Sequence, residues 1–166
     1  MIKYIDCDGV IIDTETGLFD EYHELKKINP ELKKRQYLHD LDWDYWVWQA
    51  GVLNDAVEIL KSYDPKNVEI LTRVHSLQEA RAKINFFREK KVRNNVIIVP
   101  DGMAKSSVVD PFQNVLVEDS NGNLDDWHTN HGIAIYYGTG ESVYPAVTSL
   151  ETVLNDEKFK SLVKKM

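Results

Sequence analysis

Two aspartates close together follow the first apolar run of the sequence. The stretch "YIDCDGVIIDT", residues 4–14, places Asp6 and Asp8 at the end of what reads as a buried strand, with Gly9 directly after them. Buried carboxylates cost free energy unless a positive or hydrogen-bonding group meets them. The pair therefore predicts a partner elsewhere in the chain.

Other polar residues follow later apolar runs in the same way. Thr72 ends the second run and Arg73 follows it, Glu118 and Asp119 end the fourth, and Lys105 lies in the loop after the third. In an open α/β sheet, ligands bind beyond the carboxyl ends of the strands. We therefore expect these side chains to meet Asp6 and Asp8 at one edge of the sheet.

Such a gathering of acids predicts a cation. Several carboxylates at one edge repel one another strongly, and a divalent ion relieves the repulsion, with Lys105 offsetting part of the remaining charge. Ligand sets made only of oxygen suit Mg²⁺, which often shares its coordination with a substrate phosphate. The predicted cofactor is Mg²⁺, and its candidate ligands are Asp6, Asp8, Asp119 and Glu118.

Five short apolar runs must position these residues. They read as near-continuous apolar strands, which is typical of a parallel sheet covered on both faces. Helical segments alternate with them, so the sequence predicts an α/β fold with a doubly wound, Rossmann-like parallel sheet. The runs are residues 2–6, 67–72, 95–100, 114–119 and 132–137.

The helical pattern is clearest over residues 76–91. Ser76 and Glu79 form a capping-box pattern, which predicts the start of a helix. One face carries apolar residues and is expected to pack against the sheet. These residues are Leu77, Ala80, Ile84 and Phe87.

One segment breaks the alternation of strands and helices. Between Asp13 and about Tyr63 there is no strand candidate, only a helical pattern rich in charged and aromatic residues. This segment is too long for a simple crossover helix. We therefore predict a small inserted helical cap at residues 14–62, on an α/β core made of residues 1–13 and 63–166.

Composition narrows the partners and the compartment. The chain has 166 residues and a net charge of -7, which argues against binding to a nucleic acid polymer or to an anionic membrane. Cys7 is the only cysteine, and a lone cysteine in a buried strand fits a small core residue in a reducing compartment. No apolar run approaches the length of a membrane span or a signal peptide, so we expect a cytoplasmic protein.

Four motifs in this order resemble the haloacid dehalogenase-like (HAD) hydrolases. They are "DCDGVIIDT", "ILTR", the loop lysine Lys105 and "VEDSNGN", and together they span nearly the whole chain. The resemblance implies that Asp6 is a nucleophile that forms an aspartyl-phosphate. It also implies that Asp8 protonates the leaving group and later activates water, and that Lys105 steadies both the nucleophile and the phosphate.

The resemblance also implies how substrate and metal are held. Thr72 would bind the transferred phosphoryl group, and Asp119 would hold Mg²⁺ together with Asp6 and the main-chain carbonyl of Asp8. Glu118 departs from the aspartate that is most frequent at its position. The candidate substrate-binding residues are Thr72, Arg73, Gly9, Trp43 and Trp46.

Within the family, residues 83–127 are most similar to the 5'(3')-deoxyribonucleotidase group. This similarity implies a phosphatase that acts on a small phosphomonoester, and Trp43, Trp46 and Trp48 would either stack a base or form the core of the cap. The alternatives are a sugar-phosphate phosphatase or phosphomutase, since the cap selects the leaving group, and a non-catalytic binding module. A dehalogenase proper is disfavoured because Asp8 supplies the acid that a phosphate ester needs.

Overall fold

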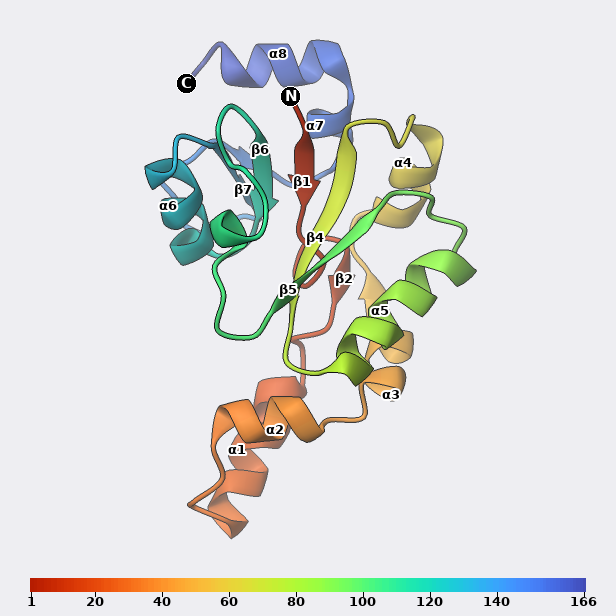
Figure 1. The fold of residues 1–166 in the computed structure, drawn as a ribbon, viewed down its shortest axis with the longest axis vertical. Coiled ribbons are helices and arrows are strands. Elements are labelled where there is room, and N and C mark those ends of the chain that lie inside the picture. Colours follow the sequence, from red (N-terminus) through yellow and green to blue (C-terminus); the bar gives the residue numbers. More distant parts are fainter.

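A sheet of six parallel strands forms the centre of the molecule (Figure 1). The computed structural model describes residues 1–166. The predicted α/β fold with a parallel sheet is confirmed, and each of the five predicted runs contains a strand. In spatial order the strands are β5 (Val96–Pro100), β4 (Val68–Val74), β1 (Lys3–Ile5), β6 (Val115–Glu118), β7 (Ile133–Tyr137) and β8 (Ala146–Val147).

Helices cover both faces of this sheet. Successive strand residues point to opposite faces, so Ile5 and Val117 lie in a large core, while Tyr4 and Leu116 lie in a smaller one. The large core includes residues of α4, α5, α7 and α8, and the smaller one includes Leu124 and Trp127 of α6. The helices after residue 55 are α4 (Ala56–Ser62), α5 (Leu77–Glu89), the 3-10 turn η1 (Lys105–Ser107), α6 (Asn121–Thr129), α7 (Glu151–Leu154) and α8 (Asp156–Val163).

Three helices form the excursion that follows the first strand. They are α1 (Leu18–Ile28), α2 (Lys34–Asp40) and α3 (Trp43–Gln49). Helices α1 and α2 project from one end of the molecule, α3 lies beside α5, and both chain termini lie at the opposite end (Figure 1).

A two-stranded antiparallel pair lies at the base of this excursion. It joins β2 (Ile12–Asp13) to β3 (Gly51–Val52). The sequence pattern predicts no strand between residues 13 and 63, which is wrong at β3, because two residues are too few to show a period. Helix α4 buries Ala56, Val57 and Leu60 in the large core. We propose that the cap proper is the excursion between β2 and β3, inside the predicted range 14–62.

Helix α5 shows one correction with consequences for the site. Leu77 is 90% exposed, so the prediction that it packs against the sheet is wrong. The buried face carries Ala80, Phe87 and, between them, Lys83 with no exposed surface. Leu77 is the first residue of the helix, where a side chain lies beyond the edge of the core, whereas the spacing of Ala80, Lys83 and Phe87 follows the helical repeat.

None of these helices combines the length and the apolar character needed to cross a lipid bilayer.

Candidate active site

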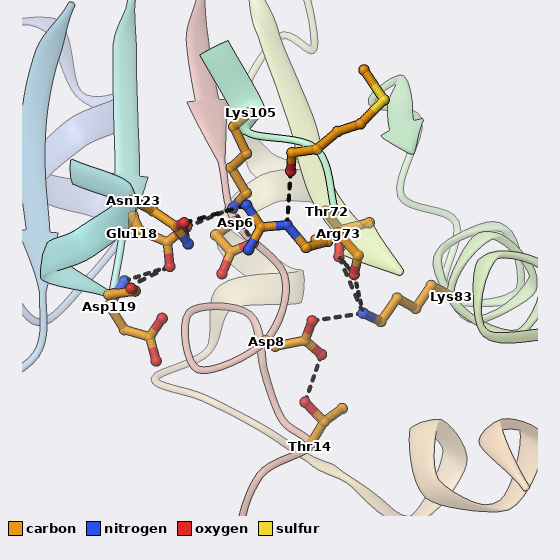
Figure 2. A network of polar contacts seen from close by, with 12 residues as sticks. Asp6, Asp8, Thr14, Thr72, Arg73, Lys83, Lys105, Glu118, Asp119 and Asn123 are labelled. Atoms are coloured by element: carbon orange, nitrogen blue, oxygen red, sulfur yellow. Dashed lines mark hydrogen bonds and ion pairs between the residues drawn. The ribbon is translucent and has the colours of Figure 1, made fainter. Parts of the chain in front are cut away.

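Asp6 and Glu118, at the ends of β1 and β6, both contact Lys105 of η1 (Figure 2). Nζ of Lys105 donates to Oδ1 of Asp6 at 2.5 Å and to Oε2 of Glu118 at 2.6 Å. All three side chains are buried. Lys105 is therefore the positive partner of Asp6, the first of the two aspartates in residues 4–14.

A tight loop after β1 carries the chain from Asp6 to Asp8. The amides of Ile11 and Ile12 both donate to the carbonyl of Cys7, at 2.9 and 3.1 Å. Gly9 has φ +76°, a conformation that favours glycine, and a Cβ built there would lie 2.0 Å from Oδ2 of Asp119. Gly9 thus lets the loop turn and lets Asp119 approach the backbone.

We expect Gly9→Ala to lower the free energy of unfolding by roughly 2–4 kcal/mol, since backbone strain and a clash with Asp119 add together. It should also displace the Asp119 carboxylate and reduce any activity of the site. Gly17→Ala is the matched control, because Gly17 has φ +81° with open space around it, and it should cost only about 1–2 kcal/mol. Urea unfolding of both variants measures the difference, and equal losses would contradict the close approach of Asp119.

Asp8 lies on a second network, separate from Lys105. Its Oδ2 accepts from Nζ of Lys83 at 2.6 Å, and its Oδ1 accepts from the Thr14 hydroxyl at 2.6 Å. Burial alone would raise the pKa of Asp8, but Lys83 and Thr14 stabilise the charged form, so the pKa lies below its ordinary value. Asp8 is a carboxylate held from two sides.

The sequence analysis did not identify Lys83 and Glu79 as part of the site. The two side chains lie one turn apart on α5, both buried, and Nζ of Lys83 contacts Oε2 of Glu79 at 2.5 Å. The capping box is formed in part: Ser76 Oγ accepts from the amide of Glu79 at 3.1 Å, but the Glu79 carboxylate accepts instead from the amide of His75 at 2.9 Å and pairs with Lys83. The signal in the sequence that could have identified these two residues is a glutamate–lysine pair at i, i+4 inside the apolar repeat of the helix.

Three acids form a cluster suited to a divalent cation. Carboxylate oxygens of Asp6, Glu118 and Asp119 lie within 4.8 Å of one another. Burial and neighbouring carboxylates raise the pKa of Asp6 to about 8, against the opposing effect of Lys105, and burial raises the pKa of Asp119 to about 6. A hard dication would offset this repulsion, so the donor set fits Mg²⁺.

The members of this cluster are not equally available to a metal. Glu118 accepts four hydrogen bonds, from Lys105, Asn123 and the amides of Asp119 and Ser120. This supports Asp119 as the better candidate ligand. The Asp8 side chain instead faces Lys83 and Thr14, and only its main-chain carbonyl stays a predicted ligand.

Thr72 and Arg73 lie near the end of β4, between the two networks (Figure 2). Thr72 is fully buried, and its hydroxyl accepts from Nζ of Lys83 at 3.1 Å. The Arg73 guanidinium donates to the carbonyl of Met103 at 3.1 Å and to Asn123 at 3.4 Å. Arg73 therefore ties β4 to the loop after β5 and to α6.

A cavity of about 480 Å³ lies between the cap and the sheet. Its wall includes Asp8, and the cap supplies residues from α1, α2 and α3. Trp43 lines it and lies parallel to the His75 ring, with ring centroids 6.3 Å apart. Trp46 packs against the large core and does not line the cavity. The structure thus brings one of the two predicted substrate-binding tryptophans to the cavity.

Comparisons with known proteins give a match of fold. No family model matches the sequence, and no curated protein matches it. A HAD-like family hydrolase from Xanthomonas campestris is similar over 100% of this chain and 94% of its own, with a TM-score of 0.65 and 10% identity.

Two phosphatases are similar in the same way. A HAD phosphatase from Thermococcus onnurineus shares 14% identity, with 92% of this chain and 95% of its own covered and a TM-score of 0.60. D,D-heptose 1,7-bisphosphate phosphatase from Burkholderia thailandensis shares 12% identity, with 94% and 97% covered and a TM-score of 0.56. The chain therefore has the HAD fold, which confirms the predicted resemblance at the level of fold.

Proposed function

We propose that this chain, which has the fold of the HAD hydrolases, is a Mg²⁺-dependent phosphatase that hydrolyses small phosphomonoesters through an aspartyl-phosphate. The main support is the placement of Asp6. Its carboxylate is held by Lys105 beside the acidic cluster, while Asp8, two residues along the chain, lies at the cavity under the cap.

The first half of the reaction uses both aspartates. Oδ1 of Asp6 is held by Lys105, so Oδ2 is the oxygen that attacks phosphorus. The bond from phosphorus to the ester oxygen breaks, and that oxygen takes a proton from Asp8. The negative ester beside Asp8 raises the proton affinity of that carboxyl when substrate binds. Bound Mg²⁺ would neutralise charge on the phosphoryl group.

The second half restores the enzyme. Asp8 returns to its charged form and accepts a proton from water as the water oxygen attacks phosphorus. The bond between Asp6 and the phosphoryl group breaks, and inorganic phosphate leaves. The Lys83 and Thr14 contacts favour the charged form of Asp8, which is the form that this step requires.

The wall of the cavity supports a proposed class of leaving group. Phe19 and Trp43 line the same cavity as Asp8 and could contact a base there, so we propose deoxynucleoside monophosphates as the first class of substrate. Sugar phosphates are the second class, because Lys34, Arg35 and Asp101 line the same cavity and can hydrogen-bond hydroxyl groups.

A panel of phosphomonoesters in Mg²⁺ tests both the activity and the substrate class. Hydrolysis of p-nitrophenyl phosphate supports a phosphatase, and its absence for every ester would favour a binding module. Trp43→Leu should lower kcat/KM for a deoxynucleotide by about tenfold or more, with a smaller loss for p-nitrophenyl phosphate.

Trp46→Leu is the matched control, since Trp46 also packs against the large core but does not line the cavity. It should leave the ratio of the two kcat/KM values unchanged. Equal ratios in the wild type and in Trp43→Leu would contradict a nucleotide site, and a wild-type preference for sugar phosphates would favour the second class.

A further inference from the structure

The Lys83 ammonium is the most completely enclosed positive charge of the site, with no exposed side-chain surface. It contacts Glu79 Oε2 at 2.5 Å, Asp8 Oδ2 at 2.6 Å, Thr72 Oγ1 at 3.1 Å and the Arg73 carbonyl at 3.3 Å. A lysine offers three N–H donors, so every donor has an acceptor. Burying this charge is costly without such partners.

These acceptors belong to different parts of the proposed reaction. Asp8 exchanges a proton with the leaving group, and Thr72 meets the transferred phosphoryl group. Figure 2 shows the lysine reaching from α5 to both, with Thr14 on the far side of Asp8. One ammonium therefore sets the position of the proton carrier relative to the phosphate-binding hydroxyl.

Glu79 fixes the lysine in turn. Its Oε1 accepts from the amide of His75 at 2.9 Å, and its Oε2 receives Lys83. The glutamate is itself buried, with 1% of its side chain exposed. Lys83 thus has a support on its own helix, and rotation away from Asp8 would leave the Asp8 carboxylate with the Thr14 hydroxyl as its only side-chain donor.

We propose that Lys83, supported by Glu79, is a positioning residue that holds the Asp8 carboxylate in line with the ester oxygen. This inference rests on the proposed function. Small misplacements of a catalytic group cost large factors in rate. Because proton donation matters most when the leaving oxygen is basic, the loss of Lys83 should be selective for poor leaving groups.

The test compares two substrates in three variants. Lys83→Met keeps most of the unbranched side chain and removes the ammonium donors, and Glu79→Gln keeps Lys83 but weakens its support. We expect kcat for an alkyl phosphate to fall about a hundredfold in Lys83→Met, with a loss below about tenfold for p-nitrophenyl phosphate. Glu79→Gln should show the same selectivity to a smaller degree, and it carries the test if Lys83→Met does not fold.

Lys3→Met is the matched control. Lys3 is a largely buried lysine on β1, with 13% of its side chain exposed, and it pairs with Asp156 at 3.6 Å. This variant should lower Tm without changing the ratio of the two kcat values. If Lys83 had only a structural role, Lys83→Met would likewise lower Tm without changing this ratio.

The outcomes separate the two proposals. If the wild type is active and Lys83→Met does not change the ratio of kcat for the two substrates, the role of Lys83 is overturned and the proposed function still stands. If Lys83→Met does not fold, the same ratio in Glu79→Gln decides. A wild type that hydrolyses no ester overturns the proposed function and this inference with it. A selective loss with the poor leaving group supports both.

Discussion

Asp6→Asn should reduce turnover by at least roughly a thousandfold for every phosphomonoester, while the fold is kept. The amide has nearly the shape of the carboxylate, and its oxygen can still accept from Lys105. It is a far poorer nucleophile, so the aspartyl-phosphate does not form. Steady-state assays with p-nitrophenyl phosphate and a nucleotide measure the loss, and acid-quenched labelling with a radioactive substrate detects the covalent intermediate in the wild type.

The same variant should be at least as stable as the wild type in chelator at neutral pH. Burial and neighbouring acids raise the pKa of Asp6 to about 8, well above its ordinary value. A raised carboxyl pKa means that the folded state holds its proton more tightly, so this group contributes stability at low pH that is lost as the pH rises from about 4 to about 8. The neutral asparagine avoids that loss.

Asp64→Asn provides the matched control for Asp6→Asn. Asp64 accepts from the amide of Lys66 and lies in a surface hollow with Met1 and Lys3, which belong to the end of β1 away from the site. Its activity should equal that of the wild type. If Asp6→Asn kept even a tenth of the wild-type rate, Asp6 would not be the nucleophile.

From the sequence it was possible to predict which side chains meet at the edge of the sheet, but not which of them form hydrogen bonds and ion pairs with one another. Parallel strands end at one edge, so apolar runs followed by Asp6, Thr72 or Glu118 were sufficient to predict a common site. The partner of each acid depends on helix and loop geometry that no run of residues encodes. The family resemblance implied the pairing of Lys105 with Asp6, whereas the pairing of Lys83 with Asp8 follows from the structure alone.

Lys83 shows where the sequence reasoning failed. A lysine within an amphipathic helix is normally solvated, because burying a charge is costly. Its burial depends on Asp8 and Thr72, which are distant in sequence, and on Glu79 one turn earlier. The sequence also did not distinguish Trp43 from Trp46 of α3, since both contact the large core and only Trp43 also lines the cavity. Only the packing of that helix separates them.

Removal of divalent cations should abolish activity, and added Mg²⁺ should restore it. The three acids of the cluster lie within 4.8 Å of one another, and the pKa of each is raised. A cation that binds only the folded state stabilises it by about 2.7 kcal/mol at a hundred times its Kd. For a chain of this size, Tm should therefore rise by roughly 5–10 °C. Calorimetry with chelator, with Mg²⁺ and with NaCl at matched ionic strength measures the shift.

Two conservative variants identify which acid holds the metal. Asp119→Asn should shift the Mg²⁺ midpoint upward by about tenfold or more, because Asp119 is the cluster member without the four donors that occupy Glu118. Glu118→Gln should weaken Mg²⁺ binding less and lower Tm more, because one of the two oxygens that accept these four hydrogen bonds becomes an amide NH₂ group, which cannot accept them. A larger Mg²⁺ effect in Glu118→Gln would assign the metal to Glu118, and a Tm rise of equal size with NaCl would mean that the cluster responds to ionic screening and holds no specific ion.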